Sequence, residues 1–124
     1  MNERELIIDQ RGLNNKKIHM SICILSYNSS LFIERCLDSL INQTDKRFEI
    51  LINDDNSKDD TVKKIKNHAK KIKIKPNGNI KLYKCFKNQG IVKNAKFLLD
   101  NSKGEIFKLL GADDFLENNH VEKI

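Results

Sequence analysis

The chain has 124 residues, of which 39% are hydrophobic and 32% are charged, and its formal net charge is +6 at pH 7. This length fits one small domain, and no stretch approaches the roughly 20 consecutive apolar residues that cross a bilayer. Only four of the 23 basic residues are arginine and tryptophan is absent, which argues against nucleic acid as a partner despite the positive charge. The N-terminus has no signal-peptide pattern, so we expect a cytoplasmic protein without a transmembrane segment.

The cysteines indicate a reducing environment. Cys23, Cys36 and Cys85 are widely spaced and flanked by apolar residues, with neither a disulfide framework nor a metal-binding spacing. We therefore expect three buried, free thiols.

The first part of the chain predicts a strand followed by a helix. Residues 1–17 form an N-terminal extension in which we find no interpretable pattern. The nearly continuous apolar segment 18–25 predicts a strand buried on both faces. Apolar residues then recur at helical spacing over 32–41, with Ser29 or Ser30 as the N-cap.

The pattern repeats in the middle of the chain. Residues 48–52 predict a second buried strand, which runs into the acidic loop 53–60. A lysine-rich helix with a narrow apolar stripe follows over 62–72, and Asp59 or Asp60 suits its N-cap.

The last third contains two more predicted strands. Residues 80–86 alternate only weakly between apolar and polar, which predicts an edge strand, and 106–110 predict a further buried strand. Asn118 or Asn119 could cap a short final helix. Between the strands we expect a helix whose buried face carries Ile91, Ala95, Leu98 and Leu99.

The alternation of strands and helices predicts an α/β fold over residues 18–124. The sheet should be Rossmann-like and mostly parallel, with helices on both faces. Ligands of such sheets bind at the carboxyl ends of the strands, which directs attention to loops 26–30, 54–60 and 111–114.

Four carboxylates follow two of the predicted strands. Asp54 and Asp55 end the second strand, and Asp113 and Asp114 end the fourth. Paired acids need a compensating cation or hydrogen-bond donors, and a natural cation is Mg²⁺ or Mn²⁺, which prefers oxygen ligands and substrate phosphates. The sequence therefore predicts a metal-assisted phosphate site, whereas for the acidic residues at 59–60 we favour helix capping.

Several blocks together resemble the family 2 glycosyltransferases of the GT-A fold over about residues 18–120. Their order and spacing are those of the family. The blocks are Leu25-Ser26-Tyr27-Asn28 (Pro-Thr-Tyr-Asn in the family), Cys36 to Thr44 (a helix ending Asn-Gln-Thr), Asp54 to Thr61 (Asp-Asp-Gly-Ser-Thr-Asp-Gly-Thr), Asn88-Gln89-Gly90, and Gly104-Glu105 followed by Asp113-Asp114.

The resemblance implies an enzyme that transfers a sugar from a nucleoside diphosphate sugar donor to an acceptor, either a glycan or a lipid-linked molecule. Ser26, Tyr27 and Asn28 would then lie beside the nucleobase. Asp54 or Asp55 would hold the base or ribose through a charge-assisted hydrogen bond.

The resemblance also implies a divalent metal, Mg²⁺ or Mn²⁺, on Asp113 that stabilises the departing nucleoside diphosphate. Gly111 stands where the family's Asp-x-Asp motif has its first acid, to which a contact with the donor's ribose is often assigned. Asp114 would partly take over that ribose contact. The acceptor half and the general base are expected beyond residue 124, so this chain would be the donor-binding half.

Further expectations concern partners and rival functions. A sheet built to continue would leave an exposed edge that favours association with a second copy, and peripheral contact with a membrane is compatible with the composition. The alternatives are a non-catalytic nucleotide-binding remnant and a phosphoacceptor signalling domain. The signalling alternative is disfavoured because its acid pair usually follows the first strand, not the second.

Overall fold

The structure, a computed structural model, describes residues 3–14, 17–72 and 75–123. Its strands are β1 (Arg4–Gln10), β2 (Met20–Ser26), β3 (Phe48–Asp54), β4 (Ile80–Cys85) and β5 (Ile106–Gly111). Its helices are α1 (Ile33–Ile41), α2 (Thr61–Lys70), α3 (Ile91–Asn101) and α4 (His120–Lys123).

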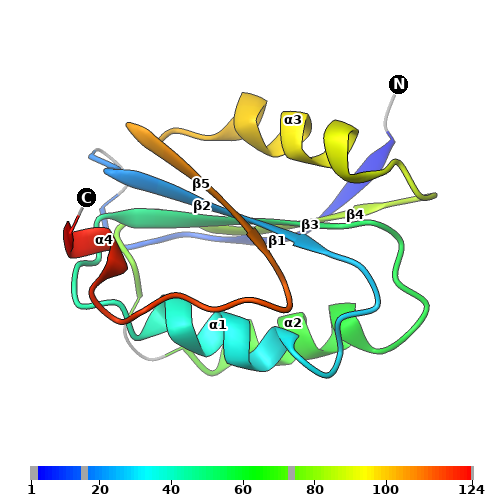
Figure 1. Cartoon of the computed structure of the whole chain (residues 1–124), viewed down its shortest axis with the longest axis horizontal. Helices are drawn as coiled ribbons and strands as arrows, with labels where there is room; N and C mark the ends of the chain where they lie inside the picture. Colours follow the sequence, from blue (N-terminus) through cyan, green and yellow to red (C-terminus); the bar gives the residue numbers. More distant parts are fainter. Residues whose placement is uncertain (1–2, 15–16, 73–74, 124) are drawn as a thin grey trace.

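The strands form one sheet in the order β1-β4-β3-β2-β5. Neighbours from β4 to β5 are parallel, and β1 alone runs antiparallel, against β4. Helices α1 and α2 cover one face and α3 covers the other (Figure 1). The predicted α/β class with a mostly parallel sheet and helices on both faces is confirmed.

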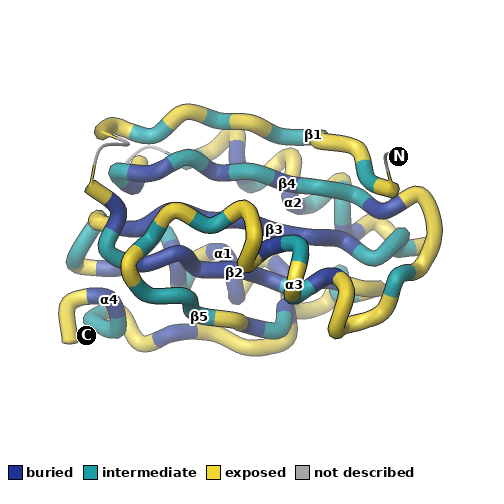
Figure 2. The backbone as a smooth tube through the Cα atoms, turned by 90° about the horizontal axis from the view of Figure 1, so that it is seen from above, coloured by how far each residue is buried: buried dark blue, intermediate teal, exposed yellow. Residues whose placement is uncertain are grey.

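The core lies on both sides of the two central strands, β2 and β3. Figure 2 shows them as the most continuously buried part of the sheet. The larger cluster joins the sheet to α1 and α2, and a smaller one, Cys23, Leu51 and Leu98, lies under α3. Strands buried on both faces need continuous apolar sequence, which is why these two are recognisable from sequence.

The N-terminal extension contains a strand that the sequence analysis did not find. Strand β1 pairs with β4 over the register Arg4↔Cys85 to Gln10↔Ile80, so β4 is an inner strand and its prediction as an edge is wrong. The polar composition of β1 suits its own edge position, because among the described strands it pairs with β4 alone. Residues 1–2 and 15–16 of the extension lie outside the described residues, as do residues 73–74 in the loop after α2.

The far edge of the sheet is formed by β5. Within the described residues it pairs with β2 and with no other strand.

The buried face of α3 differs from the prediction. Ile91 and Leu99 are 72% and 52% exposed, whereas Asn94 and Leu98 are buried. The hydrophobic pattern was misleading here because one of the buried positions is polar and forms hydrogen bonds within the fold.

The predicted helix caps are also partly wrong. The N-cap residue of α1 is Phe32, whereas a serine was expected there. Ser29 takes part through its backbone carbonyl, which accepts the Ile33 N–H. Asp60 is the N-cap residue of α2 without a side-chain cap bond, while Asp59 accepts the backbone N–H of Thr61.

The expectation of buried, free thiols is confirmed for all three cysteines. Burial raises the pKa of the Cys23 and Cys36 thiols to about 12, so both stay protonated at neutral pH. No helix within the described residues is long and apolar enough to cross a membrane.

Candidate functional site

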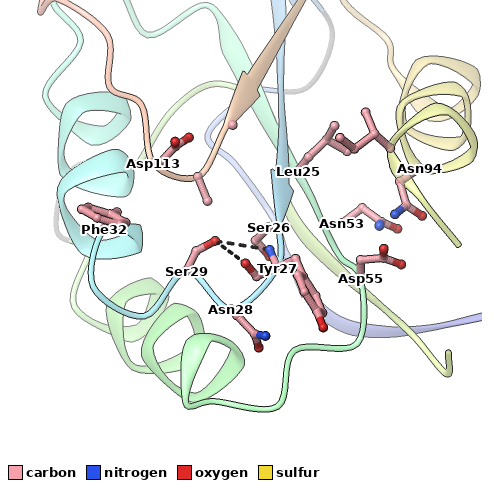
Figure 3. A pocket seen from close by; sticks show the side chains of 13 residues that line it. Leu25, Ser26, Tyr27, Asn28, Ser29, Phe32, Asn53, Asp55, Asn94 and Asp113 are labelled. Atoms are coloured by element: carbon pink, nitrogen blue, oxygen red, sulfur yellow. Dashed lines mark hydrogen bonds between the residues drawn. The ribbon is translucent and has the colours of Figure 1, made fainter. Parts of the chain in front are cut away.

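A cavity of about 420 Å³ lies at the carboxyl ends of β2, β3 and β5, where the sheet rule places a ligand. Figure 3 shows its residues, with Asp55 and Asp113 on opposite sides. The lining consists of Leu25, Ser26, Tyr27, Asn28, Ser29, Phe32, Asn53, Asp55, Ile91, Asn94, Gly111, Ala112 and Asp113.

Asp55 supplies the carboxylate on one side of the cavity. Its oxygens accept the backbone N–H groups of Gln89 at 2.7 Å and Gly90 at 3.3 Å. Burial opposes ionisation of Asp55, but hydrogen bonds from Gln89, Asn94, Gly90 and Asn88 outweigh it and lower the pKa. Gly90 also precedes α3, whose N-terminal dipole favours a negative charge. Asp55 is therefore held as an anion that can accept a further hydrogen bond.

Asp54, the other acid of the predicted pair, does not line the cavity. Its side chain is fully buried, and its carboxylate accepts the Ser26 hydroxyl at 2.7 Å, the Ser57 hydroxyl at 2.6 Å and the Ser57 N–H at 2.8 Å. The family resemblance implied either acid as the base or ribose contact. The structure assigns Asp54 to holding the loop, because consecutive side chains at a strand end point to opposite sides.

Two asparagines in the left-handed region shape the loops after β2 and β3. Asn28 has φ of 47° and Asn56 has φ of 65°, a conformation that asparagine tolerates better than most residues. The Asn28 N–H donates to the Ser57 hydroxyl, and its side-chain oxygen accepts the Lys58 N–H, both at 2.8 Å. These bonds join the two loops and leave Tyr27, 49% exposed, at the cavity mouth.

The predicted residues from 26 to 28 thus differ in what they offer a ligand. The Ser26 hydroxyl is buried against Asp54 and the Asn28 amide is bonded between the loops. Tyr27 presents its ring to the cavity mouth, so it is the side chain of this block best placed to contact a ligand.

Asp113 supplies the carboxylate on the other side of the cavity. It is exposed, and its backbone carbonyl accepts a hydrogen bond of 3.0 Å from Arg35. A Cβ atom on Gly111 would lie 2.8 Å from Oδ1 of Asp113, so the glycine leaves room for that carboxylate. Asp114 is exposed as well but does not line the cavity, so its predicted donor contact stays a prediction.

The single carboxylate of Asp113 fits a divalent cation that is also coordinated by a bound ligand. No group of three His, Cys, Asp or Glu residues in the described parts of the chain would hold a metal by itself. Mg²⁺ commonly takes one or two carboxylates together with substrate phosphates. Asp113 provides one such carboxylate facing the cavity.

Three residues around the cavity were not found by the sequence analysis. Asn53 and Asn94 are buried polar residues in its lining, and Arg4 of β1 donates to both of them. Asn53 could have been noticed as a polar side chain at the end of an apolar strand. Arg4 carries no sequence signal, since its role depends on the pairing of β1.

Comparison with known proteins gives a family match over most of the chain. The family model described as "Glycosyl transferase family 2" matches residues 21–124. The chondroitin synthase of Escherichia coli is 35% identical over 104 residues, covering 83% of this chain and 14% of that protein. The hyaluronan synthase of Pasteurella multocida is 34% identical over 124 residues, covering 96% of this chain and 12% of that protein. The chain therefore spans about one seventh or less of these relatives.

Solved structures share the fold. S. aureus TarS 1–349 in complex with UDP-GlcNAc matches with a TM-score of 0.75 and 26% identity, covering 86% of this chain and 30% of that one. The mannosyltransferase PcManGT from Pyrobaculum calidifontis, in complex with GDP-Man and Mn²⁺, has a TM-score of 0.71 and 20% identity, with the same coverages.

Proposed function

This chain belongs to glycosyl transferase family 2, and from that membership we propose that its cavity binds the nucleoside diphosphate sugar donor of a glycosyl transfer. The observation that carries the proposal is the pair of carboxylates, Asp55 and Asp113, on opposite sides of one cavity at the strand ends. Asp55 is held by backbone N–H groups, whereas Asp113 is exposed. The two carboxylates therefore suit two different parts of one ligand.

The nucleobase belongs at Asp55 in this proposal. An ionised carboxylate only accepts hydrogen bonds. It therefore favours a base that presents a ring N–H, as uracil and guanine do and as adenine and cytosine do not. The ring of Tyr27 at the cavity mouth can stack on such a base. Uracil is the first candidate, because the similar TarS structure is a complex with UDP-GlcNAc.

The diphosphate belongs near Asp113. With Mg²⁺ or Mn²⁺ bound there, the ion would neutralise the charge that develops on the departing nucleoside diphosphate. Asp113 would hold it through one carboxylate, and Arg35 fixes the backbone at that residue through its bond to the carbonyl. Asp114 completes the proposed donor contacts as the neighbouring acid.

The acceptor and its general base are proposed to lie outside these 124 residues, as the family resemblance implies. The base would remove the acceptor hydroxyl proton as the oxygen attacks the sugar. We retain the cytoplasm as the proposed location, which three free thiols support. Self-association through the β5 edge is a further part of the proposal.

The first experiment is a thermal melt against UDP, GDP, CDP and ADP, each with and without Mn²⁺. A ligand at ten times its Kd adds about 1.4 kcal/mol, which raises Tm by about 3 to 8 °C in a domain of this size. We expect UDP to give the largest shift and Mn²⁺ to increase it. Asp113→Ala should remove the Mn²⁺-dependent part, whereas Asp100→Ala, an exposed acid paired with Lys96, should not.

The alternative of a non-catalytic nucleotide-binding remnant makes the same melting prediction, so it needs a second assay. Donor hydrolysis or transfer by a protein that includes this chain separates the two. A cooperative melt that none of the four nucleotides shifts would contradict the proposed donor site.

A further inference from the structure

The N-terminal strand β1 lies outside the matched residues 21–124, yet it reaches the cavity through Arg4. Arg4 lies opposite Cys85 of the neighbouring strand β4. Its side chain is only 10% exposed, and its guanidinium stacks over the ring of Phe97 at 4.1 Å from the centroid. A charged group buried to this extent needs hydrogen-bond partners.

Two asparagines of the cavity lining supply those partners. Nε of Arg4 donates to Oδ1 of Asn53 at 2.8 Å, and a terminal nitrogen donates to Oδ1 of Asn94 at 2.9 Å. Asn53 is 1% exposed and Asn94 is 3% exposed. The two bonds come from one planar group with fixed donor directions, so they orient both amides together.

The orientation of Asn94 matters for Asp55. Because its carbonyl oxygen points to the guanidinium, its NH₂ group points away from Arg4. Asn94 is among the donors that lower the pKa of Asp55. In Figure 3 the amides of Asn53 and Asn94 and the carboxylate of Asp55 lie together on one side of the cavity. With the amide reversed, an oxygen would face the carboxylate and repel it.

We propose that Arg4 is a positioning residue of the donor site: it orients the side-chain amides of Asn53 and Asn94, and through Asn94 it holds Asp55 ready to accept a nucleobase N–H. The nucleobase part rests on the proposed function, whereas the effect of Arg4 on Asp55 does not. Two further ionisable groups of the described residues face this cluster. Sγ of Cys85 lies 3.4 Å from Oδ1 of Asn94 and also interacts with Asp55, and Glu3 lies 3.8 Å from the Arg4 guanidinium.

The test measures the titration of the Asp55 carboxyl carbon by NMR in the full chain, with the resonance assigned from Asp55→Asn. We expect Arg4→Met to raise the pKa of Asp55 and to weaken UDP binding about tenfold. The control Arg47→Met removes an exposed guanidinium that pairs with Asp45, and it should change neither quantity.

A double-mutant cycle separates orientation from simple charge loss. If Arg4 acts through Asn94, then Asn94→Ala should also raise the pKa of Asp55, and adding Arg4→Met should raise it little further. A direct charge effect would instead persist in the Asn94→Ala background, and that result would overturn the proposal.

Arg4→Lys covers the case in which Arg4→Met does not fold. An ammonium group keeps the charge but lacks the fork that bonds both carbonyl oxygens, so we expect a smaller rise in the pKa of Asp55. A titration of Asp55 in Arg4→Lys that coincides with the unsubstituted chain would overturn the proposal. If the titration shifts but UDP does not bind to the unsubstituted chain, Arg4 keeps its positioning role and the proposed function fails.

Discussion

Exchanging one oxygen for nitrogen at Asp54 and at Asp55 should have opposite consequences, although the two acids are adjacent. Asp54→Asn should destabilise the fold and affect nucleotide binding only through that loss. Asp55→Asn should weaken nucleotide binding and leave most of the stability intact. Both changes conserve side-chain shape, which makes each the matched control for the other.

The contacts set the expected size of each effect. The Asp54 carboxylate accepts three hydrogen bonds in a fully buried position, and an amide there would place a donor against a hydroxyl or the Ser57 N–H. Losing one bond to a charged group and weakening the others costs about 2–4 kcal/mol, which lowers Tm by about 8–15 °C in a chain of this length.

Asp55→Asn keeps one carbonyl oxygen for the 2.7 Å bond from Gln89, so we expect a stability loss below about 1.5 kcal/mol. Its effect appears in binding, because an amide is a weaker acceptor than a carboxylate. The Kd for UDP should rise about 10- to 100-fold.

Thermal melts and calorimetric titration with UDP and Mn²⁺ measure both quantities on the same samples. An unchanged Tm together with weaker binding in Asp54→Asn would contradict these roles, since Asp54 would then contact the ligand. Binding of UDP by Asp55→Asn as tight as by the unsubstituted chain would contradict them equally.

Three further predictions concern the mouth, the sheet and pH. Tyr27→Ala should weaken UDP binding by about 1–3 kcal/mol through lost stacking, measured by calorimetry, while Tyr27→Phe keeps the ring and most of the affinity. Gly104→Ala should lower Tm by an amount corresponding to about 1–3 kcal/mol, because its Cβ would lie 2.5 Å from the Ser21 nitrogen. Burial lowers the pKa of His120 below its ordinary 6.5, so the unfolded chain binds a proton first and stability falls as pH drops from 7 to 5. His120→Leu should flatten that slope in urea unfolding, and an unchanged slope would contradict the assignment.

The parts of the fold that sequence predicted best are those where one physical constraint acts alone. β2 and β3 are buried on both faces, so their composition is apolar throughout and unambiguous. β1 obeys a weaker constraint, since an edge strand tolerates polar residues and becomes a strand only through its pairing with β4. Its existence therefore depends on a partner strand far away in the sequence, in the register Arg4↔Cys85 to Gln10↔Ile80, which no local pattern encodes.

The site was predictable to the level of the loop but not of the individual side chain. Sequence placed an acid pair at the end of β3, and the resemblance offered either member as the nucleobase contact. Which acid faces the cavity depends on the pleat of the strand at its last residue, and the structure puts Asp55 there. Asn94 was missed because a polar residue within a buried helix face interrupts the apolar pattern used to find that face.

The two sides of the cavity differ in how firmly the sheet supports them. β3 is buried along its whole length and has a strand on each side, whereas β5 has one partner strand within the described residues and is mostly part-exposed. Local opening costs least where burial and pairing are least, so amide exchange should be slowest in β3 and faster in β5. The side of the cavity at Asp55 should therefore be more rigid than the side at Asp113. Under the proposed function, a preformed surface at Asp55 would select the base, and the Asp113 side would adjust to different groups carried on the phosphates.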